Sequence, residues 1–396
     1  MTPDPARVAA AIVAHYRGAK RDLPWRRTRD PYAIWVSEIM LQQTRVATVI
    51  PYWERWMAKF PTVAALAAAP LDDVLAAWAG LGYYSRARNL WNGARELPGE
   101  LPRTAAGLRA VRGIGPYTAG AIASIAFGER APLVDGNVAR VLARIFALRE
   151  NIKSTAGNKA VWARAGKVMA ALAPSAAPGD LNQGLMELGA TICTPTQPRC
   201  LVCPVTGQCA AEALGLQDAL PVVPRRKRED ELPILARTLV WAEQRGQLAL
   251  VRRRPEGLFG GLWELPPLEL AATLGIAVAS REPVAYHDQT LTHRRLRIAI
   301  VSGVLRGRAL VPLDDPGYDA VTRVAIRDAA DLGIAASTAA ILRIYKDTPW
   351  SSTPKRSLSS PRATTRSSPA SRSSATRRKT TTSAAPRRGR RRASTS

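Results

Sequence analysis

The chain has 396 residues, of which 46% are hydrophobic and 22% are charged. This length exceeds the usual size of one domain, and the composition is typical of a soluble globular protein rather than of a fibrous or disordered chain. The formal net charge of +26 indicates a polyanionic partner rather than an uncharged one. Nucleic acid is favoured over an acidic membrane surface.

No stretch of about 18 uninterrupted apolar residues occurs, and the apolar segment from Val8 to Val13 has no cleavage-site pattern. We therefore expect a cytoplasmic protein with no membrane partner.

Residues 1 to about 215 are predicted to be almost wholly helical. Ala-rich segments carry apolar residues at three- and four-residue spacing, and Pro and Gly interrupt them. One helix start is clear near Tyr32, because Asp30 can cap it and Pro31 fits its first turn. Glu38 lies within that helix, where a lone carboxylate is most often only a solvated side chain.

Two glycines, Gly113 and Gly115, interrupt the helical pattern within the stretch Val111–Gly120. They predict a tight hairpin followed by a helix with free N-terminal N–H groups, an arrangement that binds phosphate. A plain helix–turn–helix connection is the alternative. Asp135, 18 residues past Tyr117, opens a further helix, where a carboxylate is most often only a cap.

All four cysteines lie within 17 residues, spaced Cys-x6-Cys-x2-Cys-x5-Cys, at Cys193, Cys200, Cys203 and Cys209. In a reducing compartment such a group indicates metal ligands rather than disulfides. Structural zinc usually takes two closely spaced pairs, and only Cys200 and Cys203 form one. The spacing alone favours a four-iron cluster and leaves zinc open.

The composition changes near Leu220. Residues 216–232 contain two prolines and the basic run Arg225–Arg228, which predicts a solvated linker. Residues 233–345 predict an α+β domain, because short β-type runs alternate with turns that carry Gly or Pro. These runs are residues 238–241, 248–251 and 296–301. The remaining residues, 346–396, carry 14 Lys or Arg and one Asp, have few apolar side chains, and are predicted to be a disordered basic tail.

The Gly hairpin, the following Asp and the cysteine spacing together resemble the helix–hairpin–helix DNA glycosylases of the endonuclease III superfamily. Four further stretches resemble its MutY family: Leu23–Arg26, Ser37–Thr44, Gly80–Tyr84 and Val134–Asn137. The resemblance covers residues 7 to 345. It implies an adenine DNA glycosylase of base excision repair, which removes adenine opposite 8-oxoguanine or guanine in double-stranded DNA.

The resemblance also implies a domain plan for this multidomain α and α+β chain. A helical glycosylase domain spans residues 1–215, with a six-helix barrel module at about 22–130 and an iron–sulfur module at about 1–21 and 131–215. One four-iron, four-sulfur cluster is held there by the four cysteines. A Nudix-like domain follows at residues 233–345. The protein is expected to be a bacterial monomer that associates with the nucleoid while it acts.

The catalytic roles implied by the resemblance depend on three residues. In bifunctional relatives a lysine at the position of Tyr117 attacks the sugar; Tyr cannot form a Schiff base, so the enzyme stops at base removal. Glu38 is implied to protonate adenine at N7, and Asp135 to stabilise the sugar cation. Its helix N-terminus favours the ionised form of Asp135. Asn137 and Tyr117 are implied to hold Asp135 in place.

Adenine must leave the duplex before it can react. The resemblance places Gln43 and Tyr83 beside the lesion, with Tyr83 as a wedge, and Leu41 on the adenine side; on composition alone, an aromatic such as Tyr83 is usually in the core. Three residues, Arg21, Trp25 and Arg26, are implied to line the pocket and read the flipped base. The other DNA-contacting residues implied are Gln42, Gly113 and Gly115.

The second domain departs from its relatives in two ways. Residues 258–266 resemble the entry to a Nudix-like module, but residues 268–280 offer only Glu269 as an acidic side chain, so nucleotide hydrolysis is not expected. The family's lesion-reading Phe-Ser-His corresponds to Leu291, Thr292 and His293. Thr292 keeps the hydroxyl of the serine, whereas Leu291 lacks the aromatic ring of the phenylalanine. His293 is otherwise a surface histidine.

Three other functions compete with this prediction. The nearest is a bifunctional endonuclease III-like glycosylase and lyase for oxidised pyrimidines, which Tyr117 and the second domain oppose. A non-catalytic DNA-binding factor would explain the basicity, the hairpin and the cysteines, but not Glu38 together with Asp135. A Nudix hydrolase is opposed by the missing acidic helix.

Overall fold

The computed structural model describes residues 2–225, 228–305, 313, 315–329 and 332–345. All of these residues lie within the unit Met1–Leu358 that contacts within the chain define. The predicted disordered tail and residues 226–227 of the predicted linker lie outside the described residues. None of the described helices is both long enough and apolar enough to span a membrane.

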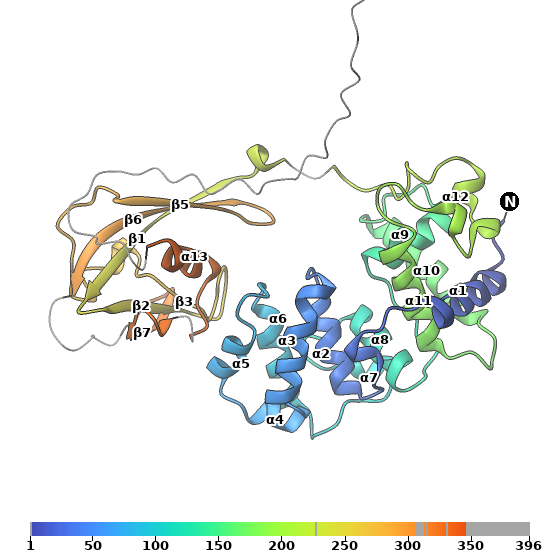
Figure 1. Ribbon diagram of the computed structural model, residues 1–396, viewed down its shortest axis with the longest axis horizontal. Helices are drawn as coiled ribbons and strands as arrows, with labels where there is room; N and C mark the ends of the chain where they lie inside the picture. The colour runs from blue at the N-terminus through green and yellow to red at the C-terminus, as the bar shows by residue number, and fades with distance from the viewer. Residues whose placement is uncertain (1, 226–227, 306–312, 314, 330–331, 346–396) are drawn as a thin grey trace, which may run out of the picture. The chain divides into compact units, whose positions relative to one another are not determined.

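The first 215 residues form helices joined by turns, which confirms the predicted helical fold class of this region (Figure 1). In chain order the α-helices are α1 (Pro5–Ala19), α2 (Pro31–Leu41), α3 (Val46–Lys59), α4 (Val63–Ala68), α5 (Leu71–Ala77), α6 (Ser85–Glu96), α7 (Ala105–Leu108), α8 (Pro116–Ala126), α9 (Gly136–Ile145), α10 (Thr155–Ala170), α11 (Pro178–Thr191) and α12 (Ala210–Ala213).

Local sequence explains where the helices of the site begin. The Asp30 carboxylate accepts a hydrogen bond of 2.9 Å from the backbone N–H of Tyr32, and Pro31 is the first residue of α2, as predicted. The carboxylate of Asp135 caps α9 in the same way, at 2.7 Å from the N–H of Val138. The caps therefore fix where α2, which carries Glu38, and α9, which follows Asp135, begin.

Two hydrophobic cores support the helical region. The first runs from Leu23 to Ala131 and is built around the fully buried indoles of Trp35, Trp56 and Trp78. The second joins α1 to α9, α10 and α11, and Figure 1 shows α1 beside α10 and α11. α11 therefore closes the second core while it also contacts α8, which belongs to the first.

The described residues between 233 and 345 form a seven-stranded sheet and a helix, which confirms the predicted α+β class. The predicted strands at 238–241, 248–251 and 296–301 fall within three of these strands. The elements are β1 (Ile234–Gln244), β2 (Gln247–Arg253), β3 (Trp263–Glu264), β4 (Ile276–Ala277), β5 (Ala285–Thr290), β6 (Arg295–Leu305), β7 (Tyr318–Ala325) and α13 (Ala336–Tyr345).

The sheet pairs in the order β3-β2-β1-β6-β4, with β5 beside β6 and β7 beside β2. The β1–β6 pair is parallel and the others are antiparallel. Alternate residues of the central strands enter different cores: Leu239 and Trp241 pack on one face, Val240 and Ala242 on the other. The sheet is thus buried on both faces. Residues 268–280 hold a short turn of 3-10 helix at Leu268–Leu270 and strand β4.

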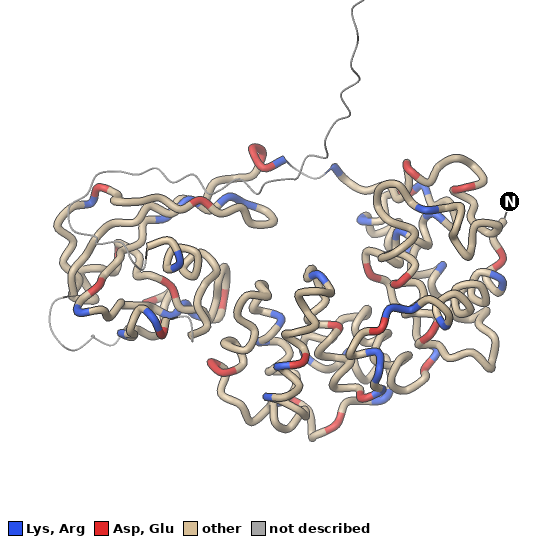
Figure 2. The backbone as a smooth tube through the Cα atoms, in the orientation of Figure 1, with Lys and Arg blue, Asp and Glu red and all other residues tan. Residues whose placement is uncertain are grey.

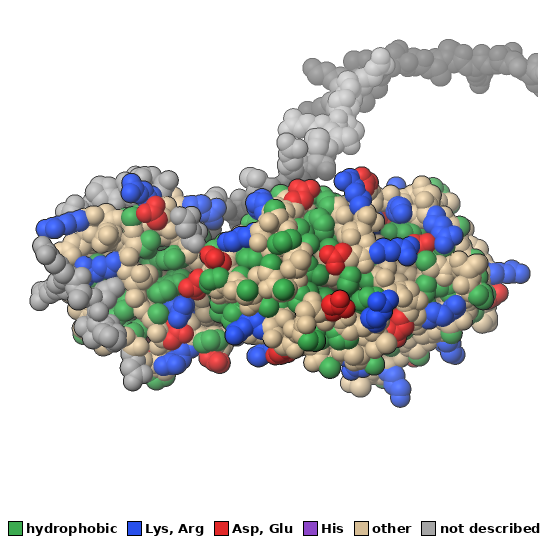
Figure 3. All heavy atoms as spheres, turned by 90° about the horizontal axis from the view of Figure 1, so that it is seen from below, with side chains coloured by type: hydrophobic (Ala, Val, Ile, Leu, Met, Phe, Trp, Pro, Cys, Tyr) green, Lys and Arg blue, Asp and Glu red, His purple; other side chains and the backbone are tan. Residues whose placement is uncertain are grey.

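Charged residues of both signs are distributed over the described chain. Lys and Arg segments alternate with Asp and Glu segments along the helices (Figure 2). On the face drawn in Figure 3, basic side chains are scattered among hydrophobic and acidic ones. The net charge of +26 belongs to the whole chain, and residues 346–396 account for 14 of its Lys and Arg.

Candidate active site

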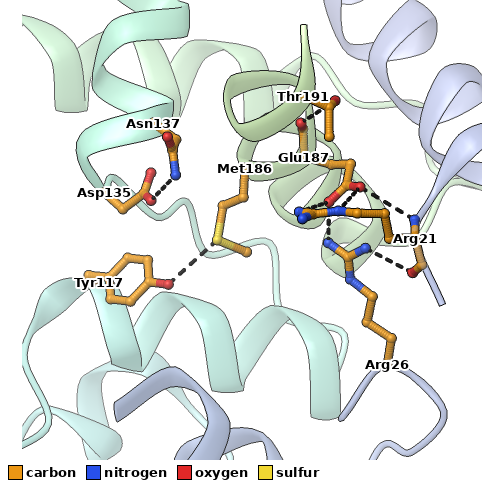
Figure 4. Close-up of polar contacts among 8 residues, drawn as sticks. All are labelled: Arg21, Arg26, Tyr117, Asp135, Asn137, Met186, Glu187 and Thr191. Atoms are coloured by element: carbon orange, nitrogen blue, oxygen red, sulfur yellow. Dashed lines mark hydrogen bonds and ion pairs between the residues drawn. The ribbon is translucent and has the colours of Figure 1, made fainter. Parts of the chain in front are cut away.

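Glu38 and Tyr117 meet in the helical region. Glu38 lies on α2 with only 4% of its surface exposed, so the solvated carboxylate considered from sequence is excluded. The Tyr117 hydroxyl, from the first turn of α8, donates a hydrogen bond to Glu38 Oε2 and lies 3.5 Å from Met186 Sδ of α11. Figure 4 shows Tyr117 directed toward Met186. Tyr117 therefore holds Glu38, where the sequence predicted that it would hold Asp135.

Burial governs the protonation of Glu38. Removing this carboxyl from water disfavours its charged form and raises its pKa to about 7, and the nearby Asp135 adds to the increase. The hydrogen bond from Tyr117 and the charge of Arg26 act in the opposite direction. A carboxyl with this pKa is protonated in about half of the molecules at pH 7 and can deliver that proton, as a general acid must.

Asp135 is held by its own helix. Its Oδ1 accepts the N–H of Val138, and its Oδ2 accepts a bond of 3.1 Å from the side-chain amide of Asn137, a contact drawn in Figure 4. Asn137 thus has the predicted contact. Burial nevertheless raises the pKa of Asp135, although these hydrogen bonds and Arg140 lower it. The N–H groups at the start of α9 favour the ionised form, as predicted, but desolvation is the larger effect and the net shift is upward.

Sequence reasoning missed Glu187, which organises the two arginines predicted to read the base. This buried carboxylate of α11 accepts hydrogen bonds of 2.6 and 2.8 Å from Arg21 and of 2.7 Å from Arg26 (Figure 4). Burial alone would raise the pKa of Glu187, but the bonds from Arg21 and Arg26 lower it to about 2. No local motif marks Glu187, since its partners lie more than 160 residues away.

The Gly hairpin has the predicted geometry. Gly113 has a φ of +83°, and a Cβ there would lie 2.8 Å from Asn89 Cβ, so a side chain at this position meets both strain and a close neighbour. Gly115 is the N-cap of α8 and makes no side-chain cap hydrogen bond. The backbone N–H groups of the first turn of α8 are therefore available to an anion.

The residues predicted to lie beside the lesion adopt strained backbone conformations. Gln43 has a φ of +57° and Tyr83 a φ of +47°, values that L side chains rarely adopt. Both side chains are exposed, so the core placement considered for Tyr83 is excluded. Gln42 follows α2, and Leu41 packs against the first helical core. Strain of this kind persists only where the surrounding structure imposes it.

A pocket borders this strained loop. The turn between β5 and β6 carries Leu291, Thr292 and His293, and Thr292 Oγ1 is hydrogen-bonded to the Tyr83 hydroxyl. Other residues that line the pocket are Leu81, Gly82, Tyr84, Ser85, Arg88, Gly257, Leu258, Phe259, Gly260, Leu262, Gln289, Thr290, Arg294 and Ala336. The hydroxyl of Thr292 thus contacts Tyr83, the residue predicted to act as the wedge.

The four cysteines converge on one cavity. Cys193, Cys200, Cys203 and Cys209 all line it, and all are free thiols. Among the described residues, no group of three or more His, Cys, Asp or Glu is arranged to hold a single metal ion. Burial raises the pKa of Cys203 to about 11, and the other thiols contribute to the increase. Burial thus favours the thiol form of Cys203, and a positively charged centre bound in the cavity would favour the thiolate instead.

One arginine connects the cysteine cavity with Asp135. Arg140 of α9 donates through Nε to the carbonyl of Cys193 at 2.8 Å and through Nη2 to Asn137 Oδ1 at 2.9 Å. Asn137 in turn donates to Asp135. A further arginine, Arg144, is buried one turn along and donates to Cys193 Sγ at 3.3 Å. Sequence reasoning missed both arginines, although their four-residue spacing places them on one face of α9.

Trp25 is the predicted base-reading residue that the structure places in the core. Its indole is 6% exposed and stands edge-on to Trp53, with ring centroids 6.1 Å apart. Arg26 extends from the same 3-10 turn, Pro24–Arg26, toward Glu187. Trp25 thus fixes the turn from which Arg26 extends.

Residues 36–165 match the model of the HhH-GPD superfamily base excision DNA repair protein. The chain is 51% identical over 223 residues to a human adenine DNA glycosylase, covering 53% of this chain and 40% of that one. It is 35% identical over 259 residues to an adenine DNA glycosylase of Buchnera aphidicola subsp. Baizongia pistaciae, covering 64% and 70%.

A solved MutT Nudix hydrolase from Burkholderia pseudomallei is similar at 17% identity and a TM-score of 0.23, covering 28% of this chain and 97% of that one. The chain spans about half the length, 40% to 60%, of the plant and mammalian relatives that it matches. The extent of the match to the Buchnera relative, together with the site geometry, shows that the chain belongs to the adenine DNA glycosylase family.

Proposed function

We propose that this protein is a monofunctional DNA glycosylase that hydrolyses the N-glycosidic bond of adenine paired with 8-oxoguanine or guanine in duplex DNA, acting as a monomer. The observation that carries the proposal is Glu38: a buried carboxyl with a pKa of about 7, hydrogen-bonded by Tyr117 and close enough to Asp135 to feel its charge. Two carboxyls in different environments are what glycoside hydrolysis requires.

In the proposed reaction Glu38 transfers its proton to N7 of the adenine, and the bond between C1′ and N9 then breaks. The electron pair of that bond leaves with the base, and Asp135 in its ionised form stabilises the cation left on the sugar. Water adds to C1′ and gives its proton to the Glu38 carboxylate, which restores the starting state. Tyr117 has no amine, so no Schiff base forms with the sugar.

Adenine release under single-turnover conditions tests this proposal. Wild-type protein should release adenine from duplexes with 8-oxoguanine or guanine opposite, and more slowly with cytosine opposite. Glu38→Gln and Asp135→Asn should each lower the rate by about 10²- to 10³-fold or more, while binding of the lesion duplex is retained. The idea fails if either variant cleaves within threefold of wild type.

We further propose that the four cysteines hold one four-iron, four-sulfur cluster. The convergence of all four cysteines on one cavity supports this. A single zinc ion needs its sulfur ligands within about 2.3 Å of one centre. A four-iron cluster takes one thiolate per iron and so has ligands spread around a larger centre. Iron and sulfide analysis of anaerobically purified protein checks this; one zinc and no iron would contradict it.

A further inference from the structure

We propose that Arg86 is a positioning residue that presets the loops carrying Gln43 and Tyr83 before DNA binds. The inference rests on the proposed function, in which these two side chains enter the duplex beside the lesion. Arg86 is the second residue of α6 and is largely withdrawn from solvent. Its guanidinium lies between the end of α2 and the loop before α6.

One side of the guanidinium secures the first loop. Arg86 Nη1 donates to the carbonyls of Ile39 at 2.9 Å and Met40 at 3.2 Å, and also to the carbonyl of Gln42. The last carbonyls of a helix have no partner within it and carry its negative dipole end, so a cation satisfies both needs. Because Gln42 directly precedes Gln43, this hydrogen bond fixes the position of the peptide group that leads into the strained residue.

The other side secures the second loop. Arg86 Nη2 donates to the carbonyls of Leu81 at 3.1 Å and Gly82 at 3.2 Å, and lies 3.4 Å from Thr44 Oγ1. The guanidinium carbon is also 5.5 Å from the ring centroid of Tyr83. A single side chain therefore holds the residue before Tyr83, the residue after Gln43 and the ring of Tyr83.

This arrangement needs an arginine. The guanidinium carries donors in a planar fork that reaches both loops at once, whereas a lysine ammonium is a point charge on a flexible stem. The left-handed conformations of Gln43 and Tyr83 are strained. The two loops would relax if the carbonyls beside these residues lost Arg86 as their hydrogen-bond donor. Relaxed loops would have to be reordered each time the protein entered a duplex, which would slow that step.

The test compares two duplexes that differ in how much the wedge must displace. One has adenine opposite 8-oxoguanine; the other has adenine opposite an abasic site, where no partner base needs to be unstacked. Arg86→Lys should lower the single-turnover rate of adenine release at least tenfold on the first duplex and less than threefold on the second. Fluorescence of 2-aminopurine beside the adenine should rise on binding of wild type and less with the variant.

The matched control is Arg95→Lys, the same substitution on the exposed part of the same helix, where the arginine lies over the ring of Trp91. It should stay within twofold of wild type on both duplexes. An equal loss on both duplexes for Arg86→Lys would overturn the positioning role. Absence of adenine release by wild type on the 8-oxoguanine duplex would instead overturn the proposed function.

A second variant covers the case in which Arg86→Lys does not fold, judged by thermal unfolding. Gly82→Ala strains the same loop, because Gly82 has a φ of +69°, and its added Cβ would meet no atom within 4 Å. The core is therefore left as it is. This variant should show the same selective loss on the 8-oxoguanine duplex, and an equal loss on both duplexes would again refute the proposal.

Discussion

Glu38 is still about half protonated at pH 7 because burial raises the pKa of its carboxyl to about 7. If that proton is given to adenine, the second-order rate constant for adenine release should fall about tenfold per pH unit above pH 7, with the protonated fraction. Protonation of Asp135, whose pKa burial also raises, should give an acidic limb. A profile from pH 4 to 10 checks both limbs; a constant rate above pH 7 would contradict the role of Glu38.

Tyr117 offers a sharper test of the same assignment. Its hydrogen bond lowers the pKa of Glu38 because it stabilises the charged carboxylate. Tyr117→Phe removes that bond, so the pKa of Glu38 should rise and the alkaline limb should move to higher pH. Comparison of the two pH profiles measures the shift. If the limb stays in place or moves to lower pH, the group titrating there is not Glu38.

Tyr117→Lys should give the protein some lyase activity. A lysine there would place an amine in the buried space beside Glu38 and Asp135, where desolvation lowers its pKa and the two carboxyls raise it. We expect slower adenine release, by about tenfold or more because the contact with Glu38 is lost, together with strand cleavage and an adduct trapped by borohydride. Adenine release without trapping above the wild-type level would show that position 117 does not face the sugar.

Helix α9 carries the contact between the cysteine cavity and the catalytic carboxylate. Arg140→Gln should break the path from Cys193 to Asn137 and leave Asp135 less well oriented. The charge-assisted hydrogen bond to Asn137 is the one that orients Asp135, and its loss should slow adenine release about 10- to 100-fold. Single-turnover kinetics measure this, with the exposed Arg149→Gln as control. Equal rates in wild type and Arg140→Gln would show that Asp135 is oriented independently of the cavity.

How well each contact could be predicted depends on how far apart its two residues lie in the sequence. Asp30 and Asp135 were placed correctly because a cap bonds to an N–H two or three residues away. Glu187 was missed because its partners lie beyond local sequence patterns. The partner of Tyr117 was predicted wrongly for a related reason: residue identity gives the hydroxyl, whereas the packing of α2 on α8 decides which carboxylate it meets.

On the scale of the whole molecule, the sheet domain contributes to the first helical core. Leu262 and Ala335 belong to that core, and the Tyr84 hydroxyl donates to the carbonyl of Ile334 at 3.5 Å. The class of this domain was predictable from its alternating apolar runs. These contacts were not, since residues of the two domains that touch show no shared pattern in sequence.

Truncation after Arg225 should therefore lower the thermal unfolding midpoint by several degrees, since it exposes apolar surface of the first core. The truncated protein should still release adenine, because Glu38, Tyr117 and Asp135 all remain. Its preference for 8-oxoguanine over guanine opposite the adenine should fall, because Thr292 is lost from beside Tyr83. The ratio of rates on the two duplexes measures this, and an unchanged ratio would refute lesion reading by the sheet domain.

The packing of α1 on α11 has a consequence for synthesis on the ribosome. Arg17 pairs with Asp180 at 2.8 Å, a contact that spans 163 residues of sequence. At about 5 to 20 residues per second, α1 would wait roughly 10 to 30 seconds for its partner to be translated. The core from Leu23 to Ala131 has all its helical parts well before then. The nascent chain thus exposes the apolar face of α1 while its middle folds, and a holding chaperone has that interval in which to bind.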